Sequence, residues 1–128
     1  MIKVKRHKLG ESAFSIGKKT KIAENANFDL TGSIIIEDGV IVSDGVYIFT
    51  HRHFWRNSRV PIIKHKELAR YDLVIKKYAF IGIYSVILGI EYIGEGAVIG
   101  AGSIVTKNIG DFEIWAGNPA KKIGLRNA

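Results

Sequence analysis

A strict period of six residues is the feature that most restricts the fold of this chain. From Val74 the sequence divides into the blocks VIKKYA, FIGIYS, VILGIE, YIGEGA, VIGAGS and IVTKNI. A helix repeats every 3.6 residues and a half-buried strand alternates every two, so neither produces a period of six. Each block is therefore one repeated structural unit. The second residue of every block is aliphatic: Ile75, Ile81, Ile87, Ile93, Ile99 and Val105.

The same register appears earlier in the chain. Its positions there are Ile16, Ile22, Phe28, Ile36, Val42 and Ile48, with a two-residue offset near Thr31-Gly32-Ser33. A short strand and a turn per unit point one such side chain inward, and three units close one coil of about 18 residues. Coils stacked about 4.8 Å apart hydrogen-bond to one another as a parallel β-helix. We expect one all-β domain, residues 1–128, of about six or seven coils.

One segment, about residues 54–72, interrupts the repeat. It is charged, aromatic and without periodicity, so we expect a loop extruded from the β-helix. Long irregular loops inside compact domains are uncommon and often carry function. His51 and His53 stand at the root of this loop, which makes them candidate site residues.

Composition excludes several classes of function. The chain has no cysteine, so disulfides and cysteine chemistry are excluded. No segment approaches the roughly 20 apolar residues of a membrane span, and we expect a cytoplasmic protein without one. The net charge of +7 suits either an anionic ligand or a solvated basic surface. Basic and aromatic residues do not interleave as in nucleic-acid modules, so no nucleic-acid partner is expected.

Two motifs carry a resemblance to a known family. They are ANFDL, residues 26–30, and IGEGAVIGAGSIVTKNIGDFEIWAGNPAKKI, residues 93–123. Together with the hexads, they resemble the hexapeptide-repeat acyltransferases, most closely the branch of the maltose, galactoside and nodulation-factor O-acetyltransferases. The resemblance implies a left-handed single-stranded β-helix, acetyl-CoA as acyl donor, and a homotrimer with sites between subunits.

The histidines fit the chemistry that this resemblance implies. Transfer of an acetyl group from a thioester to a hydroxyl needs a base, and histidine titrates near neutrality. In the resembling enzymes the catalytic histidine stands three residues after a threonine, which assigns the base to His53 when counted from Thr50. His51, two residues away on the same strand face, is assigned a supporting role.

A zinc site is the alternative for the same histidines. The γ-class carbonic anhydrases share the β-helix and bind zinc through three histidines, for which His51, His53 and His65 are available here. Their spacing in this chain does not resemble that family, so no metal is expected.

The resemblance also assigns binding residues. Acetyl-CoA contacts fall on Phe80, Ala101, Thr106, Lys107, Lys121 and Arg126, with Lys121 facing the phosphates. The acceptor contacts fall on Asp29, which is alternatively a surface-turn residue, and on Trp55, as a platform for a sugar ring. Trp115 is expected to cap the final coil.

We therefore expect an acetyl-CoA-dependent O-acetyltransferase that acts on a hydroxyl of a sugar or glycan precursor. The alternatives are N-acetylation of a nucleotide-linked amino sugar and a non-catalytic β-helix scaffold. The trimer interface is expected on flat strand faces that carry Ile83, Tyr84, Leu88 and Ile90.

Overall fold

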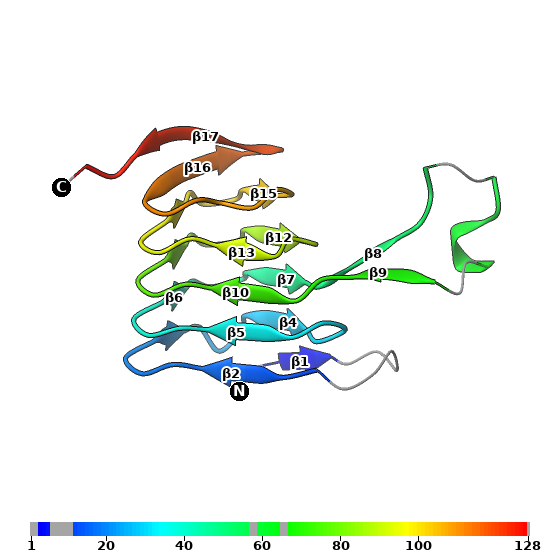
Figure 1. Ribbon diagram of the computed structural model, residues 1–128, viewed down its shortest axis with the longest axis horizontal. Coiled ribbons are helices and arrows are strands. Elements are labelled where there is room, and N and C mark those ends of the chain that lie inside the picture. Colours follow the sequence, from blue (N-terminus) through cyan, green and yellow to red (C-terminus); the bar gives the residue numbers. More distant parts are fainter. Residues whose placement is uncertain (1–2, 6–11, 57–58, 65–66, 128) are drawn as a thin grey trace.

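The computed structural model describes residues 3–5, 12–56, 59–64 and 67–127, almost all of them in short strands and turns (Figure 1). The first sheet contains β1 (Lys3–Lys5), β4 (Asn27–Asp29), β7 (Tyr47–Phe49), β12 (Val86–Leu88) and β15 (Ile104–Val105), in that spatial order. The second contains β2 (Phe14–Ile16), β5 (Ile34–Ile36), β10 (Leu73–Ile75) and β13 (Tyr92–Ile93). The third contains β3 (Lys21–Ile22), β6 (Ile41–Val42), β11 (Phe80–Ile81), β14 (Val98–Ile99), β16 (Glu113–Gly117) and β17 (Ala120–Leu125).

The chain visits the three sheets in rotation and so winds into a parallel β-helix. Four complete coils lie in the described residues: β2 to β4, β5 to β7, β10 to β12, and β13 to β15. The expected all-β class is confirmed. The number of complete coils is smaller than expected, because the segment after β7 and the antiparallel strand β17 use residues that do not continue the coil, and β16 belongs to a last coil that is not completed. The left-handed sense of the coil stays a prediction.

The core is the stack of aliphatic residues that the period of six identifies. Ile36, Ile75 and Ile93 are register partners in the second sheet, and each is buried. The other two sheets repeat this arrangement. Each such side chain contributes roughly 1.5–3 kcal/mol by leaving water, so the stack is the main source of stability.

Ile16 is the exception in this register, with 38% of its surface exposed. Its strand β2 is the last of the second sheet, and no strand in the described part of the chain lies beyond it. The expected burial of Ile16 is therefore wrong. Ile22, on the neighbouring strand β3, is partly buried and packs against the core.

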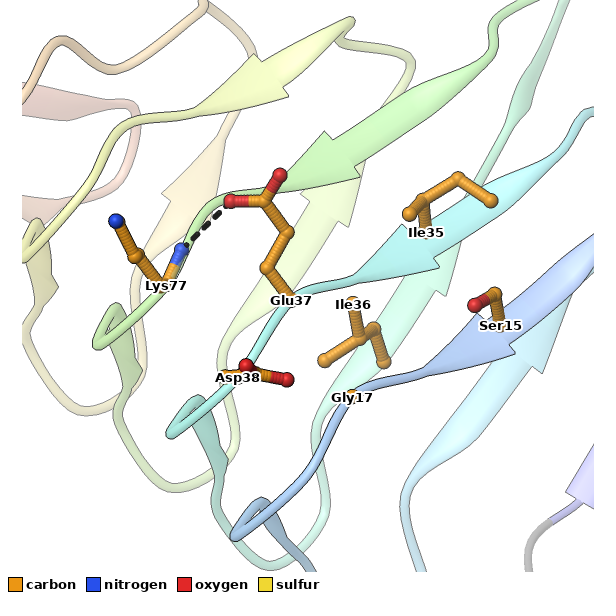
Figure 2. Close-up of a pocket in the computed structure, with 7 residues that line it drawn as sticks. All are labelled: Ser15, Gly17, Ile35, Ile36, Glu37, Asp38 and Lys77. Carbon is orange, nitrogen blue, oxygen red and sulfur yellow. Dashed lines mark hydrogen bonds between the residues drawn. The ribbon is translucent and has the colours of Figure 1, made fainter.

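Side chains in the turns satisfy backbone amides of neighbouring coils. Glu37 Oε1 accepts a hydrogen bond from the Lys77 backbone nitrogen at 3.0 Å, as Figure 2 shows. In the opposite direction along the stack, Asp38 Oδ1 accepts one from the Lys18 nitrogen at 2.7 Å. A shallow cavity of about 450 Å³ lies beside these two acidic residues (Figure 2). Because unpaired amides are costly, these contacts favour polar residues at the corners.

Aromatic residues at the corners pack over glycines of the preceding coil. Tyr84 has a φ of 58°, and Gly45, at the same place one coil earlier, has a φ of 69°. A Cβ on Gly45 would collide with the Tyr84 ring, so the glycine leaves room for the ring. Tyr78 over Gly39 and Phe112 over Gly96 repeat the arrangement.

The C-terminal end of the helix is closed by β16 and β17, which pair antiparallel. Trp115 is the register partner of Ile99 and packs against the core, which confirms its expected position over the final coil. Ile90 is buried rather than on an exposed face, so its expected place in an interface is wrong. Across the described residues, no helix has the length and apolar character needed to cross a membrane.

Replacing Gly45 with alanine should lower the free energy of unfolding by about 2–3 kcal/mol, because a strained φ and displacement of the Tyr84 ring add together. Gly102→Ala is the matched control, since Gly102 has a φ of 68° and nothing within 4 Å of an added Cβ. The control should lose only about 1 kcal/mol. Urea denaturation measures both variants. Equal losses would mean that the ring contact contributes nothing.

Candidate active site

A two-stranded arm projects from the β-helix between β7 and β10 (Figure 1). Its strands, β8 (His51–His53) and β9 (Leu68–Arg70), pair antiparallel with each other, and a short 3₁₀ helix, Ile62–Lys64, lies between them. We call residues 51–72 the arm. It leaves and re-enters at the corner between the first and second sheets. The base of the segment expected as an irregular loop is thus a paired ribbon.

The corner below the arm is shaped to receive it. A Cβ on Gly32 would collide with the backbone carbonyl of Tyr71, so glycine is needed where the arm returns. The Tyr71 nitrogen donates to the Thr50 carbonyl at 2.8 Å. Asp72 Oδ1 accepts from the Ser33 nitrogen at 2.9 Å, which ties the returning chain to the coil below. The two-residue offset seen in the sequence lies at this corner.

Asp29 lies at the centre of a buried hydrogen-bond network. Its side chain is 4% exposed, so it is not a surface-turn residue. Its Oδ1 accepts from Thr31 Oγ1 at 2.8 Å, and its Oδ2 accepts from the Thr50 backbone nitrogen at 3.0 Å. Thr50 Oγ1 also donates to the Asp29 carbonyl at 2.7 Å. The two threonines therefore fix the carboxylate in one orientation.

His51 is bonded to this carboxylate. Its Nδ1 lies 2.6 Å from Asp29 Oδ2, and its side chain is 12% exposed. Burial raises the pKa of the Asp29 carboxyl, but hydrogen bonds from His51, Thr31 and Thr50 outweigh this and leave the pKa below its ordinary value. Asp29 is therefore a carboxylate at neutral pH, and it accepts a hydrogen bond from the protonated Nδ1 of His51.

His53 lies beside this pair but outside the network. Its ring centroid is 5.2 Å from that of His51, with the two rings edge to face, and its side chain is exposed. A pair of adjacent imidazoles, one of them held by a buried carboxylate, is an arrangement suited to proton transfer.

A cavity of about 550 Å³ opens next to the two histidines. Its walls are mostly apolar and come from both the β-helix and the arm. The lining residues are Phe49, His51, Arg52, His53, Trp55, Ile62 and Leu88. Trp55 is 58% exposed and stacks with Arg56, whose Cζ lies 5.0 Å from the ring centroid. A small molecule held here would contact both histidines.

The residues expected to bind acetyl-CoA are spread over the molecule. Thr106 and Lys107 follow β15 and lie at the arm's corner, two coils beyond β7. Ala101 is exposed in the turn between the third and first sheets.

Three of the expected acetyl-CoA contacts lie away from the arm. Phe80, 37% exposed, is on β11 of the third sheet, and Lys121 is exposed on β17. Arg126 follows β17, and its Nη1 donates to the Gly96 carbonyl at 3.0 Å. The third sheet is the side of the coil opposite the arm's corner, so one chain does not bring these residues to the histidine cavity.

No group of three or more His, Cys, Asp or Glu side chains in the described ranges is placed to hold a metal ion. His65, which the zinc alternative requires, lies outside the described residues.

The pairing of Asp29 with His51 was not anticipated from the sequence. The signal for it is the coil register: Asn27 and Phe28 are partners of Tyr47 and Ile48, so Asp29 lies directly below the start of the arm. Reading the offset coil as 20 residues long would have brought Asp29 under Phe49 and next to His51.

The chain is similar to known acetyltransferases. A galactoside O-acetyltransferase of Escherichia coli (strain K12) is 34% identical over 116 residues, covering 86% of this chain and 56% of the relative. A dTDP-3-amino-3,6-dideoxy-alpha-D-galactopyranose 3-N-acetyltransferase of Aneurinibacillus thermoaerophilus is 50% identical over 48 residues, covering 38% of this chain and 25% of the relative. No family model matches.

Solved structures show the same likeness. A galactoside acetyltransferase in complex with coenzyme A superposes with a TM-score of 0.79 at 26% identity, covering 98% of this chain and 64% of that one. The chain spans between a quarter and just over half of the length of the two curated relatives.

Asp29→Asn should remove a part of the stability that depends on pH. A carboxyl whose pKa is lowered by folding stabilises the protein at pH values above its unfolded pKa of about 3.9. That stabilisation is lost as the pH falls through the lower pKa of the folded state. Urea denaturation should therefore show a loss of about 1–3 kcal/mol for Asp29→Asn at pH 7 that shrinks towards pH 3. Asp44→Asn, at an exposed aspartate, is the control. A loss for Asp29→Asn that is equal at both pH values would contradict the assignment.

Proposed function

Because the chain belongs to the hexapeptide-repeat acyltransferases, we propose that it transfers an acetyl group from acetyl-CoA to a hydroxyl of a sugar or glycan precursor. The observation that carries this proposal is the buried Asp29 carboxylate 2.6 Å from His51 Nδ1, at the wall of a cavity of about 550 Å³. A histidine with one nitrogen held in this way is oriented to act as a base through the other.

His51 is the base in this mechanism. Its Nδ1 proton stays on the hydrogen bond to Asp29, and its Nε2 takes the proton of the acceptor hydroxyl as that oxygen attacks the thioester carbonyl. The carbon–sulfur bond breaks, the acetyl group stays on the acceptor, and the departing thiolate receives the proton from Nε2. Asp29 remains ionised and stabilises the imidazolium formed in between.

This assignment exchanges the roles that the count from Thr50 gave to the two histidines. His53 is exposed, and among the described residues it is His51 that pairs with the Asp29 carboxylate. It adjoins His51 at 5.2 Å between ring centroids and lines the same cavity, which suits a part in binding the acceptor. Trp55 lines the same cavity and offers an aromatic face there.

The acyl donor binds, in this proposal, between two copies of the chain in a homotrimer. Thr106 and Lys107 lie at the arm's corner, whereas Phe80 and Lys121 lie on the opposite side, so the two groups of expected donor residues meet only if a second copy is present. Ala101, Lys121 and Arg126 complete the donor contacts expected from the resemblance. Exposed Ile83 and Tyr84, next to the third sheet, support an interface on that side.

N-acetylation of a nucleotide-linked amino sugar is the second candidate. The relative that acts on a dTDP-linked amino sugar is 50% identical over 48 residues, which favours this acceptor class. The same base serves both reactions, because an ammonium group must also lose a proton before its nitrogen attacks.

An acceptor screen with released CoA thiol as readout tests the proposed function. Turnover is expected with at least one sugar carrying a free hydroxyl, and competition against a nucleotide-linked amino sugar ranks the two candidates. Preference for the amino sugar would replace O-acetylation by N-acetylation. No coenzyme A binding by calorimetry would leave the non-catalytic scaffold as the better account.

His51→Ala should lower kcat by about 10² to 10⁴ while coenzyme A affinity, measured by calorimetry, stays close to that of the wild type. His53→Ala is the matched control, since it removes a neighbouring imidazole that is not bonded to Asp29, and it should lower kcat by less than about tenfold. The reverse order of effects would return the base to His53.

A further inference from the structure

Arg52 stands between the two histidines and holds their strand to later coils. Its Nη2 donates to three backbone carbonyls: Leu88 at 2.8 Å, Gly89 at 3.2 Å and Thr106 at 3.0 Å. Leu88 ends β12 and Thr106 follows β15, so one guanidinium bridges the two coils beyond the arm.

Gly89 and Tyr71 flank the Arg52 side chain. Gly89 has a φ of 61°, and a Cβ there would lie 2.8 Å from Arg52 Cγ and would collide with its Nε. On the other side, the Arg52 Cζ lies 5.6 Å from the centre of the Tyr71 ring, at the returning end of the arm. The side chain is thus held between the coil turn and the arm.

Stability alone does not account for an arginine here. Its Nε is buried with no hydrogen-bond partner, and none of its contacts in the described ranges is a carboxylate. Arg52 is partly buried, and holding its charge against neutral carbonyls with one donor unpaired carries a desolvation cost that an apolar side chain of similar length would avoid. The residue therefore contributes something other than net stability.

The strand β8 is fixed from two directions. Asp29, on β4 of an earlier coil, holds His51, and Arg52 ties the same strand to the turns after β12 and β15. Besides these side chains, β8 pairs only with β9 in the described structure. The Thr106 carbonyl that accepts from Arg52 belongs to a residue expected to contact acetyl-CoA.

We propose that Arg52 is a positioning residue that couples the histidine strand to the donor-side turn at Thr106 and Lys107, an inference that rests on the proposed function. Its guanidinium keeps the base and the thioester at a fixed separation through the backbone carbonyls of Leu88, Gly89 and Thr106 that it holds. Loss of this bridge displaces both sides of the site together.

Three variants test the coupling. Arg52→Met keeps the length of the side chain but removes its donors, Arg52→Lys keeps the charge, and Gly89→Ala displaces the guanidinium without changing it. Gly39→Ala is the matched control. Gly39 also has a positive φ, of 69°, and an added Cβ would lie 2.5 Å from the side chain of Tyr78, at a different corner.

Arg52→Met should lower kcat by roughly 10- to 100-fold, since small displacements of a base are costly, and weaken coenzyme A binding by about fivefold. Arg52→Lys should recover part of both losses. Gly89→Ala should reproduce them, and the double variant with Arg52→Met should be no worse than the more severe single variant. Gly39→Ala should lose stability but neither kcat nor affinity.

Hydrogen exchange of backbone amides supplies a readout that does not need turnover. In Arg52→Met and Gly89→Ala, exchange over residues 48–54 should rise by about tenfold relative to the wild type, and Gly39→Ala should leave it unchanged. The proposal would be overturned if Arg52→Met exchanged its amides over residues 48–54 at the wild-type rate. It would also be overturned if the losses of kcat in Arg52→Met and Gly89→Ala multiplied in the double variant. If the wild type itself shows no acetyl transfer, the proposed function fails, while the exchange rates still decide whether Arg52 holds the strand.

Discussion

Each coil of this protein must place its aliphatic residue directly over that of the coil before, and this register decides where the arm and the histidines can lie. Ile48 and Ile87 are partners in the first sheet although the arm lies between them in the chain. The arm can therefore exist only if it leaves and returns at one corner. Gly32, which leaves space for the Tyr71 carbonyl, and Asp72, which accepts from Ser33, meet that requirement.

The fixed position of β8, the first strand of the arm, allows a reactive histidine at this corner. Residues of successive coils lie one above another, so a carboxylate on β4 comes directly under the strand that starts the arm. Asp29 is buried without loss of its charge because Thr31, Thr50 and His51 all donate to it. The same geometry that stacks the core thus orients an imidazole at the edge of a cavity.

The sequence predicted the core better than the site. The period of six identified buried positions from Phe28 to Val105, because one repeated unit imposes one repeated burial pattern. It failed at Ile16, where burial depends on what covers the end of the stack. It also missed the bond between Asp29 and His51, since that contact depends on a coil two residues longer than the 18-residue coils between β10 and β15. The resemblance assigned Phe80 and Lys121 to acetyl-CoA binding, and both residues lie on the side opposite the arm. Sequence reasoning within one chain had no means of detecting that separation.

The tautomer of His51 shows whether the buried Asp29 carboxylate orients this imidazole. Nitrogen-15 NMR of protein labelled at histidine, recorded near pH 9 where an ordinary imidazole is neutral, distinguishes a proton on Nδ1 from one on Nε2, and a His51→Gln variant assigns the signals. We expect His51 to carry its proton on Nδ1, donated to Asp29, and Asp29→Asn to shift both nitrogen signals. A proton on Nε2, or signals unaffected by Asp29→Asn, would contradict the proposal that a buried carboxylate prepares His51 to act as the base.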